Sequence, residues 1–77
     1  MDEQIKQIAE RLRGLRDVLE LTAEDIAREC DIYPYDYRLA ETGDFDISVS
    51  MLQKIARRYG VSLDALMFGE EPKMSSY

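Results

Sequence analysis

The chain has 77 residues, one cysteine, no histidine and a net charge of −6. This length suits one small domain, near the lower limit at which a single core is self-sufficient. A lone cysteine excludes an internal disulfide, the lack of histidine argues against a Cys/His metal site, and no run of about 18 apolar residues could span a membrane. The single thiol and an acidic N-terminus unlike a signal peptide favour a cytoplasmic protein.

The negative charge is concentrated in the middle third of the chain. Residues 22–46 hold eight acidic side chains against two basic ones, Arg28 and Arg38, for a net charge of −6. Residues 1–21 have a net charge of −1 and residues 47–77 of +1. A surface built from the middle third would therefore repel polyanions.

The first 31 residues predict two helices and a turn. Apolar residues recur at the helical spacing of three and four through the first helix, at Ile5, Ile8, Leu12, Leu15 and Leu19. Gly14 falls on the polar side of that helix. Thr22 can cap the second helix while Asp25 reaches back to the backbone, and this helix has a short apolar side made of Ile26, Ala27 and Cys30. Asp31 suits a left-handed turn residue.

Three more helices follow. Pro34 suits the first turn of the third helix and Gly43 its end. Ser48 can cap a fourth helix that ends at Gly60, and Ser62 can cap a final short one. The core side of the fourth helix carries Leu52, Ile55, Ala56 and Tyr59. We therefore predict an all-α domain of five helices, without β-strands or internal repeats.

Three motifs occur in order: "LTAEDIA", then Glu41-x-Gly43, then "LQKIARRYGVSLDALM". Because of these motifs and their order, the stretch from Ile5 to Phe68 resembles the helix-turn-helix regulators of the Cro and lambda-repressor type (the xenobiotic-response-element family). The resemblance implies a five-helix, lambda-repressor-like DNA-binding domain over residues 1–68. Its second and third helices would form the helix-turn-helix, with the third in the major groove of a two-part operator. It further implies that Arg16 and Glu41 form a half-buried ion pair that orients the third helix.

The ending "GEEPKMSSY" is similar to the segment that joins such a domain to a cupin barrel in some bacterial regulators. We therefore expect residues 69–77 to begin a linker to a C-terminal domain. That domain would respond to a small-molecule effector. A homodimer is expected, formed through this domain or through Leu66, Met67 and Phe68.

The resemblance places the candidate DNA-binding residues on the second and third helices: Thr22, Ala23, Tyr33, Pro34, Tyr35, Arg38, Leu39 and Thr42. Thr22 and the backbone amides at Ala23 could hold a phosphate, although Thr22 can cap the helix in any case. Tyr33 takes the place of a capping Ser or Thr, and its ring cannot cap.

The side chains at the base-contacting positions are unusual for that role. Proline at position 34 donates no hydrogen bond, and Leu39 could only touch a thymine methyl, whereas Tyr35 keeps a hydroxyl. Arg38 is the best candidate for a DNA contact, unless it pairs with Asp31 or Asp36.

The flanking segments give little support to DNA binding. The loop after the third helix, residues 44–46, carries two aspartates that would repel phosphate, and Phe45 is expected to pack at the edge of the core. The cations of the fourth helix, Lys54, Arg57 and Arg58, fit a solvated face better than a phosphate contact.

Two functions follow from these observations. The first is the DNA-binding domain of a bacterial or phage transcriptional regulator. The second is an acidic protein-interaction or oligomerisation module derived from the same fold, with Tyr33 and Tyr35 as contact residues. An enzyme is not expected, because no nucleophile–base pair or phosphate-binding loop is evident, and neither is a cofactor. Cys30 fits a small buried apolar residue.

Overall fold

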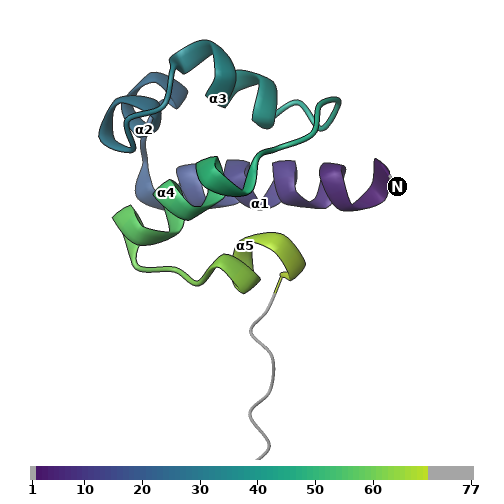
Figure 1. Cartoon of the computed structure of the whole chain (residues 1–77). Coiled ribbons are helices and arrows are strands. Elements are labelled where there is room, and N and C mark those ends of the chain that lie inside the picture. The colour runs from purple at the N-terminus through teal and green to yellow at the C-terminus, as the bar shows by residue number, and fades with distance from the viewer. Residues whose placement is uncertain (1, 70–77) are drawn as a thin grey trace, which may run out of the picture.

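The computed structural model describes residues 2–69 and, within them, five α-helices and no strand. The helices are α1 (Asp2–Leu19), α2 (Ala23–Glu29), α3 (Pro34–Ala40), α4 (Val49–Tyr59) and α5 (Leu63–Phe68) (Figure 1). The predicted all-α fold is therefore confirmed. Apart from Gly69, the linker predicted for residues 69–77 lies outside the described range.

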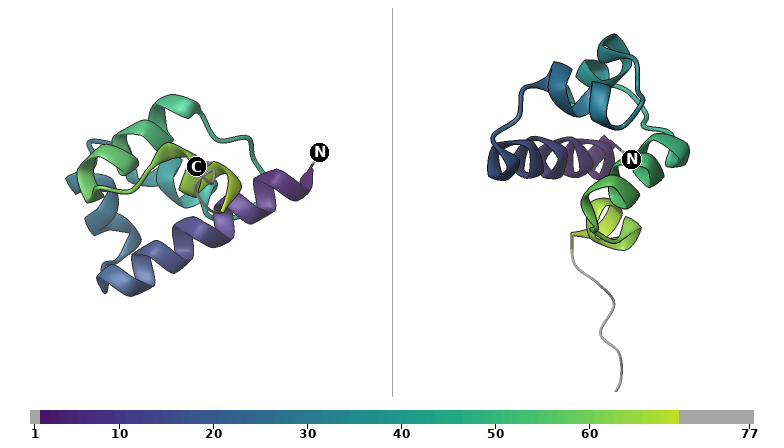
Figure 2. Two further views of the ribbon diagram at one scale, coloured as in Figure 1. Left: turned by 90° about the horizontal axis from the view of Figure 1, so that it is seen from below. Right: turned by 90° about the vertical axis from the view of Figure 1, so that its left-hand side faces the viewer.

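The long helix α1 lies in the middle of the molecule. Figure 1 and the right-hand view of Figure 2 place α2 and α3 on one side of α1 and α5 on the other. Helix α5 packs against both α1 and α4. The guanidinium of Arg11 adds to this contact by donating hydrogen bonds to the carbonyl oxygens of Met67 and Leu66, at 2.8 and 3.2 Å. None of the helices within residues 2–69 is long and apolar enough to cross a bilayer.

One core receives a side chain from every helix. Its largest fully buried members are Leu12, Ile26, Tyr37, Leu52 and Ile55, from α1, α2, α3 and α4. Leu66 of α5 is also buried, with 5% of its surface exposed. This corrects the expectation that Leu66 serves as a dimer contact, because a side chain inside the core is not available to a second chain. Tyr37 has no exposed surface, and its hydroxyl donates a hydrogen bond to the Glu41 carboxylate.

Helix ends follow the local signals in the sequence with one exception. Ser48 and Ser62 accept hydrogen bonds from the backbone N–H groups of Met51 and Ala65, and Gly60 ends α4 in the left-handed conformation. Helix α3, however, ends at Ala40 rather than at Gly43. Gly43 instead lies in the loop against α1 with a φ of 81°, a left-handed conformation that glycine adopts without strain, and a Cβ there would make only ordinary contacts with Lys6 and Ala9.

Candidate nucleic-acid interface

Helix α2 begins at a complete capping box. The Thr22 hydroxyl accepts a hydrogen bond from the Asp25 N–H at 3.1 Å, and the Asp25 carboxylate accepts one from the Thr22 N–H at 3.3 Å. The hydrogen bond from Arg28, at 2.8 Å, lowers the pKa of Asp25, and the bonds to Thr22 lower it further. The start of α2 is therefore fixed by its own side chains. Thr22 is exposed, and Ala23 is half-buried against the core.

A rigid turn joins α2 to α3. Asp31 adopts a left-handed conformation with a φ of 60°, and the Ile32 N–H donates to the Ala27 carbonyl at 2.8 Å. Tyr33 precedes α3 without a side-chain capping bond, and Pro34 occupies its first turn. Both side chains are exposed, Tyr33 at 78% of its surface.

The inner side of α3 is fixed by a polar cluster as well as by apolar packing. The Glu41 carboxylate accepts hydrogen bonds from Arg16 Nε at 2.7 Å, from Arg16 Nη2 at 3.1 Å and from the Tyr37 hydroxyl at 2.5 Å. Arg13 also donates to the Glu41 backbone carbonyl. Arg16 and Glu41 are thus an ion pair with side chains 25% and 11% exposed, on α1 and just after α3.

The same cluster shifts two pKa values. The hydrogen bond to Glu41 raises the pKa of Arg16 against the opposing effect of partial burial. Burial raises the pKa of Tyr37, and the neighbouring Glu41 carboxylate raises it further. A protonated tyrosine, a charged arginine and a charged carboxylate therefore stabilise one another, and they set the position of α3 relative to α1.

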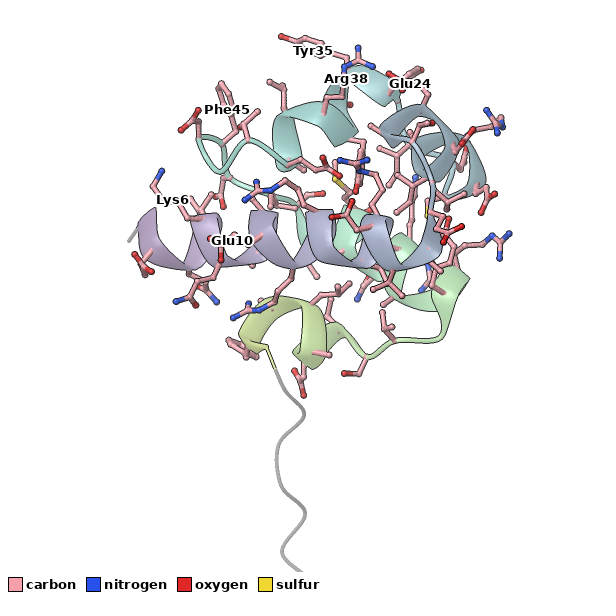
Figure 3. The ribbon with its side chains drawn as sticks, turned by 180° about the vertical axis from the view of Figure 1, so that it is seen from behind. Lys6, Glu10, Glu24, Tyr35, Arg38 and Phe45 are labelled. Carbon is pink, nitrogen blue, oxygen red and sulfur yellow. The ribbon has the colours of Figure 1, made fainter. Side chains whose placement is uncertain are left out.

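The outer side of α3 presents the other candidate residues to solvent. Tyr35 is 65% exposed and Arg38 is exposed (Figure 3). Leu39 is half-buried. The Thr42 hydroxyl donates to the Leu39 carbonyl at 2.7 Å and accepts from the Asp44 N–H at 3.1 Å, so it stabilises the end of the helix.

Arg38 has a partner that the sequence did not indicate. Its Nη1 donates to Glu24 Oε2, in the first turn of α2, at 2.5 Å. Neither Asp31 nor Asp36, the partners considered from sequence, forms an ion pair with it. Figure 3 shows Glu24, Arg38 and Tyr35 together at the same end of the molecule. Glu24 and Arg38 are 14 positions apart, and only the turn between the two helices brings them together.

The loop after α3 is acidic and partly apolar. Phe45 is 50% exposed, so the expectation that it packs at the core edge is wrong. Its short loop projects past α3, as Figure 3 shows. Asp44 contacts Lys6 at 3.9 Å, with both side chains mostly exposed. A shallow groove of about 180 Å³ lies beside the loop, with Leu39 and Met51 in its lining and Asp36 and Asp46 among its polar residues.

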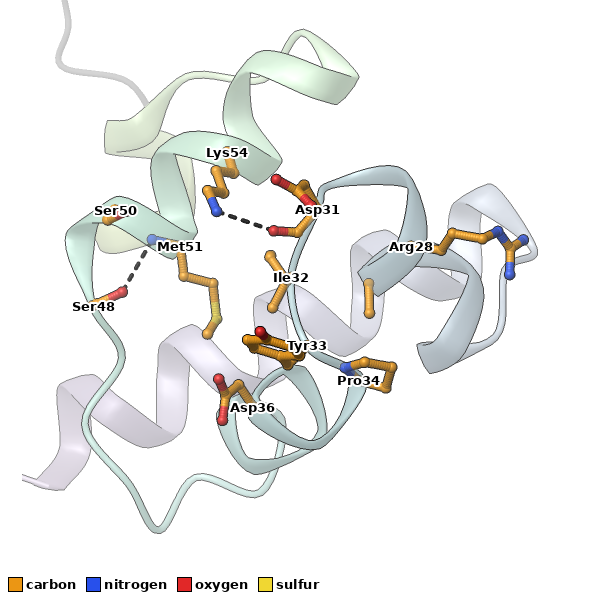
Figure 4. Close-up of a pocket in the computed structure, with 11 residues that line it drawn as sticks. Arg28, Asp31, Ile32, Tyr33, Pro34, Asp36, Ser48, Ser50, Met51 and Lys54 are labelled. Atoms are coloured by element: carbon orange, nitrogen blue, oxygen red, sulfur yellow. Dashed lines mark hydrogen bonds between the residues drawn. The ribbon is translucent and has the colours of Figure 1, made fainter.

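A larger open groove, of about 570 Å³, runs between the α2–α3 turn and the start of α4 (Figure 4). Its lining includes Ile32, Tyr33 and Met51 together with charges of both signs. Lys54 donates to the backbone carbonyl of Asp31 at 3.0 Å across this groove. Lys54 therefore links α4 to the turn.

The end of α4 forms a second polar cluster, around Glu29. This carboxylate accepts hydrogen bonds from the Tyr59 hydroxyl at 2.7 Å and from Arg58 at 3.2 Å. The Arg58 guanidinium also lies 5.2 Å from the centre of the Tyr59 ring. Burial raises the pKa of Tyr59, and Glu29 raises it further. Two of the three cations expected to be solvated, Lys54 and Arg58, thus bond to the α2–α3 segment.

The described residues bring together no group of three or more His, Cys, Asp or Glu side chains that could hold a metal ion. Cys30 is buried, and burial raises the pKa of its thiol, which disfavours the reactive thiolate.

Comparison of the chain with protein-family models, with curated proteins and with solved structures found no match.

Proposed function

We propose that this chain is the DNA-binding domain of a bacterial or phage transcriptional regulator of the Cro and lambda-repressor type. In this proposal α2 and α3 form a helix-turn-helix, and α3 lies in the major groove of a two-part operator. The observation that carries it is the division of α3 into a fixed inner side and an open outer side. Tyr37 and Ala40 are buried, whereas Tyr35 and Arg38 are exposed.

The fixed side supplies what a DNA-contacting helix needs. The Arg16–Glu41 pair and the Tyr37 hydroxyl hold α3 on α1, so its outer side chains keep a defined position. Thr22 and the first amides of α2 lie at an exposed helix start, where backbone N–H groups favour a phosphate.

The negative charge near α3 makes the proposed DNA binding weak for a single chain. Glu24, Asp36, Asp44 and Asp46 are exposed or paired near α3, and each would repel phosphate. A homodimer would offset this, because the second half-site then binds at high effective concentration. Exposed Phe68 or a C-terminal domain would provide the dimer contact, and that domain would carry any small-molecule effector. Such a regulator acts in the cytoplasm.

The test is selection of bound sequences from a pool of randomised duplexes, followed by fluorescence-anisotropy titration at 50 and 200 mM salt as working conditions. We expect one enriched two-part sequence, affinity that falls as salt rises, and weaker binding by Arg38→Ala. Arg57→Ala is the matched control, because Arg57 is exposed in the last turn of α4. Figure 1 shows that this end of α4 lies away from α3. The proposal is contradicted if the chain binds all sequences equally well or if it binds no sequence.

A second candidate function is favoured by the exposed aromatic residues. Tyr33, Tyr35 and Phe45 are 78%, 65% and 50% exposed, and Asp36 and Asp46 lie beside them. An apolar surface with acidic neighbours fits a protein partner with a cationic surface. A photo-crosslinker at position 45 separates the two functions. The interaction module predicts a crosslinked protein, and the DNA-binding domain predicts a crosslink to the selected duplex.

A further inference from the structure

We propose that Arg38 recognises a guanine in the major groove, and that Glu24 is the positioning residue that holds its guanidinium ready to do so. This inference rests on the proposed function, because it needs α3 in the major groove. It adds to the proposed function a preference for guanine and a role for Glu24, which does not itself contact DNA.

The hydrogen bonding of Arg38 leaves one edge of its guanidinium free. Only Nη1 donates to Glu24 Oε2, at 2.5 Å, and within residues 2–69 no acceptor is found for Nε or Nη2. These two nitrogens carry parallel N–H groups, and a pair of such groups matches the O6 and N7 acceptors of guanine. The Arg38 side chain is 51% exposed, so a ligand can reach it.

Both ends of the ion pair come from fixed segments. Glu24 lies in the first turn of α2, which the Thr22–Asp25 capping box closes, and Arg38 lies in the last turn of α3. A free arginine loses conformational freedom when it binds, whereas one already held by a carboxylate has lost much of it beforehand. Glu24 therefore reduces the entropy that Arg38 loses on contact with a base.

Charge favours a base contact over a phosphate contact. The Glu24–Arg38 pair is neutral as a unit, and the surrounding residues 22–46 carry a net charge of −6. Attraction to phosphate depends on net positive charge, which this surface lacks. A two-point hydrogen bond to guanine depends on direction instead. Near Arg38, Pro34 and Leu39 offer no hydrogen-bonding group to a base.

The experiment uses the duplex selected by the wild-type chain. We expect a guanine at one fixed position in each half-site. Arg38→Ala should weaken binding to this duplex by about 5- to 150-fold and remove the preference at that position alone. Replacing the guanine by 7-deazaguanine, which lacks N7, should weaken wild-type binding but add little to the effect of Arg38→Ala. Such non-additivity identifies the contacting pair.

The role of Glu24 is tested on the same duplex. Glu24→Ala should reduce the guanine preference by roughly two- to fivefold, as expected for losing an exposed ion pair. Glu24→Gln, whose amide oxygen can still accept from Arg38, should lose less. Glu10→Ala removes another exposed carboxylate, on α1, and should leave the preference unchanged. Circular dichroism confirms that each variant is folded.

Two results would overturn this inference while leaving the proposed function intact. One is that Arg38→Ala weakens binding equally whichever base stands at the guanine position of the duplex, because Arg38 then contacts phosphate. The other is an unchanged guanine preference in Glu24→Ala and Glu24→Gln, whatever their overall affinity, because the carboxylate then only repels DNA and does not position Arg38. A wild-type chain that selects no duplex overturns the inference and the proposed function together.

Discussion

Glu41→Ala is expected to be the most destabilising single substitution of a polar side chain in the described part of this domain. The carboxylate accepts two hydrogen bonds from Arg16 and one from Tyr37. Its removal leaves the hydroxyl of the fully buried Tyr37 without a hydrogen-bond acceptor. It also leaves the Arg16 guanidinium without its counter-charge.

The expected magnitude follows from how deeply each partner is buried. An unsatisfied buried hydroxyl costs about 1–3 kcal/mol. Breaking a fully buried ion pair costs about 3–5 kcal/mol, but Arg16 is 25% exposed and can be partly hydrated, so we take about 1 kcal/mol for it. The sum is about 2–4 kcal/mol in the free energy of unfolding. In a domain of this size that lowers the melting temperature by roughly 10–30 °C.

Urea and thermal unfolding, followed by circular dichroism at 222 nm, measure the effect. Tyr37→Phe should cost about 1–2 kcal/mol, because Glu41 keeps Arg16 as a partner. The triple variant Arg16→Met/Glu41→Leu/Tyr37→Phe should be less destabilised than Glu41→Ala, because it leaves neither a buried hydroxyl nor a partly buried charge without a partner. Glu10→Ala, an exposed glutamate of α1, should change stability by less than about 0.5 kcal/mol. A Glu41→Ala chain as stable as Glu10→Ala would refute the reasoning.

Three further predictions concern stability. Gly14→Ala should raise the free energy of unfolding by about 1 kcal/mol, and Gly60→Ala should lower it by about as much. Neither new Cβ meets an atom within 4 Å, but only Gly60 has a positive φ. Urea titrations in which both variants shift stability in the same direction would contradict this. Thr22→Ala should cost about 1 kcal/mol through the lost cap, and an unchanged melting temperature would count against it. Burial raises the pKa of Tyr37 and Tyr59, so the unfolded chain ionises first and stability should fall above about pH 10, by up to about 1.4 kcal/mol per pH unit for each residue. The double phenylalanine variant should show a smaller fall in urea unfolding between about pH 9 and pH 11, with the buried Cys30 thiol, whose pKa is also raised, still contributing. An equal fall in both chains would be contrary evidence.

The sequence alone was enough to predict the five helices within residues 2–69, although not where α3 ends, and the capping residues explain why. Thr22, Ser48 and Ser62 each bond to a backbone N–H three positions later, so the signal and its effect lie within one helical turn. Gly60 acts through its own φ. The apolar spacing in α1 likewise predicted which of its sides is buried. Interactions of such short range can be recognised without knowing how the helices pack.

The outer side of α3 could be predicted only in part. Residues two positions apart on a helix lie on different sides of it, which accounts for buried Tyr37 and exposed Tyr35. It could not predict that Phe45 is half exposed or that Leu66 is buried. Their exposure depends on where the α3–α4 loop and α5 lie, and many residues set those positions together.

Apart from the Arg16–Glu41 pair, which the resemblance implied, the long-range charge partners were decided by the tertiary structure alone. Glu24 and Arg38 are 14 positions apart, and Glu29 and Tyr59 are 30 apart. Their contacts depend on the angle between α2 and α3, set at the left-handed Asp31, and on the packing of α4 against that turn. A small change of that angle would move the ends of two exposed side chains out of hydrogen-bonding range. The sequence thus determined the helices and their buried sides, whereas the packing of those helices determined which charges meet.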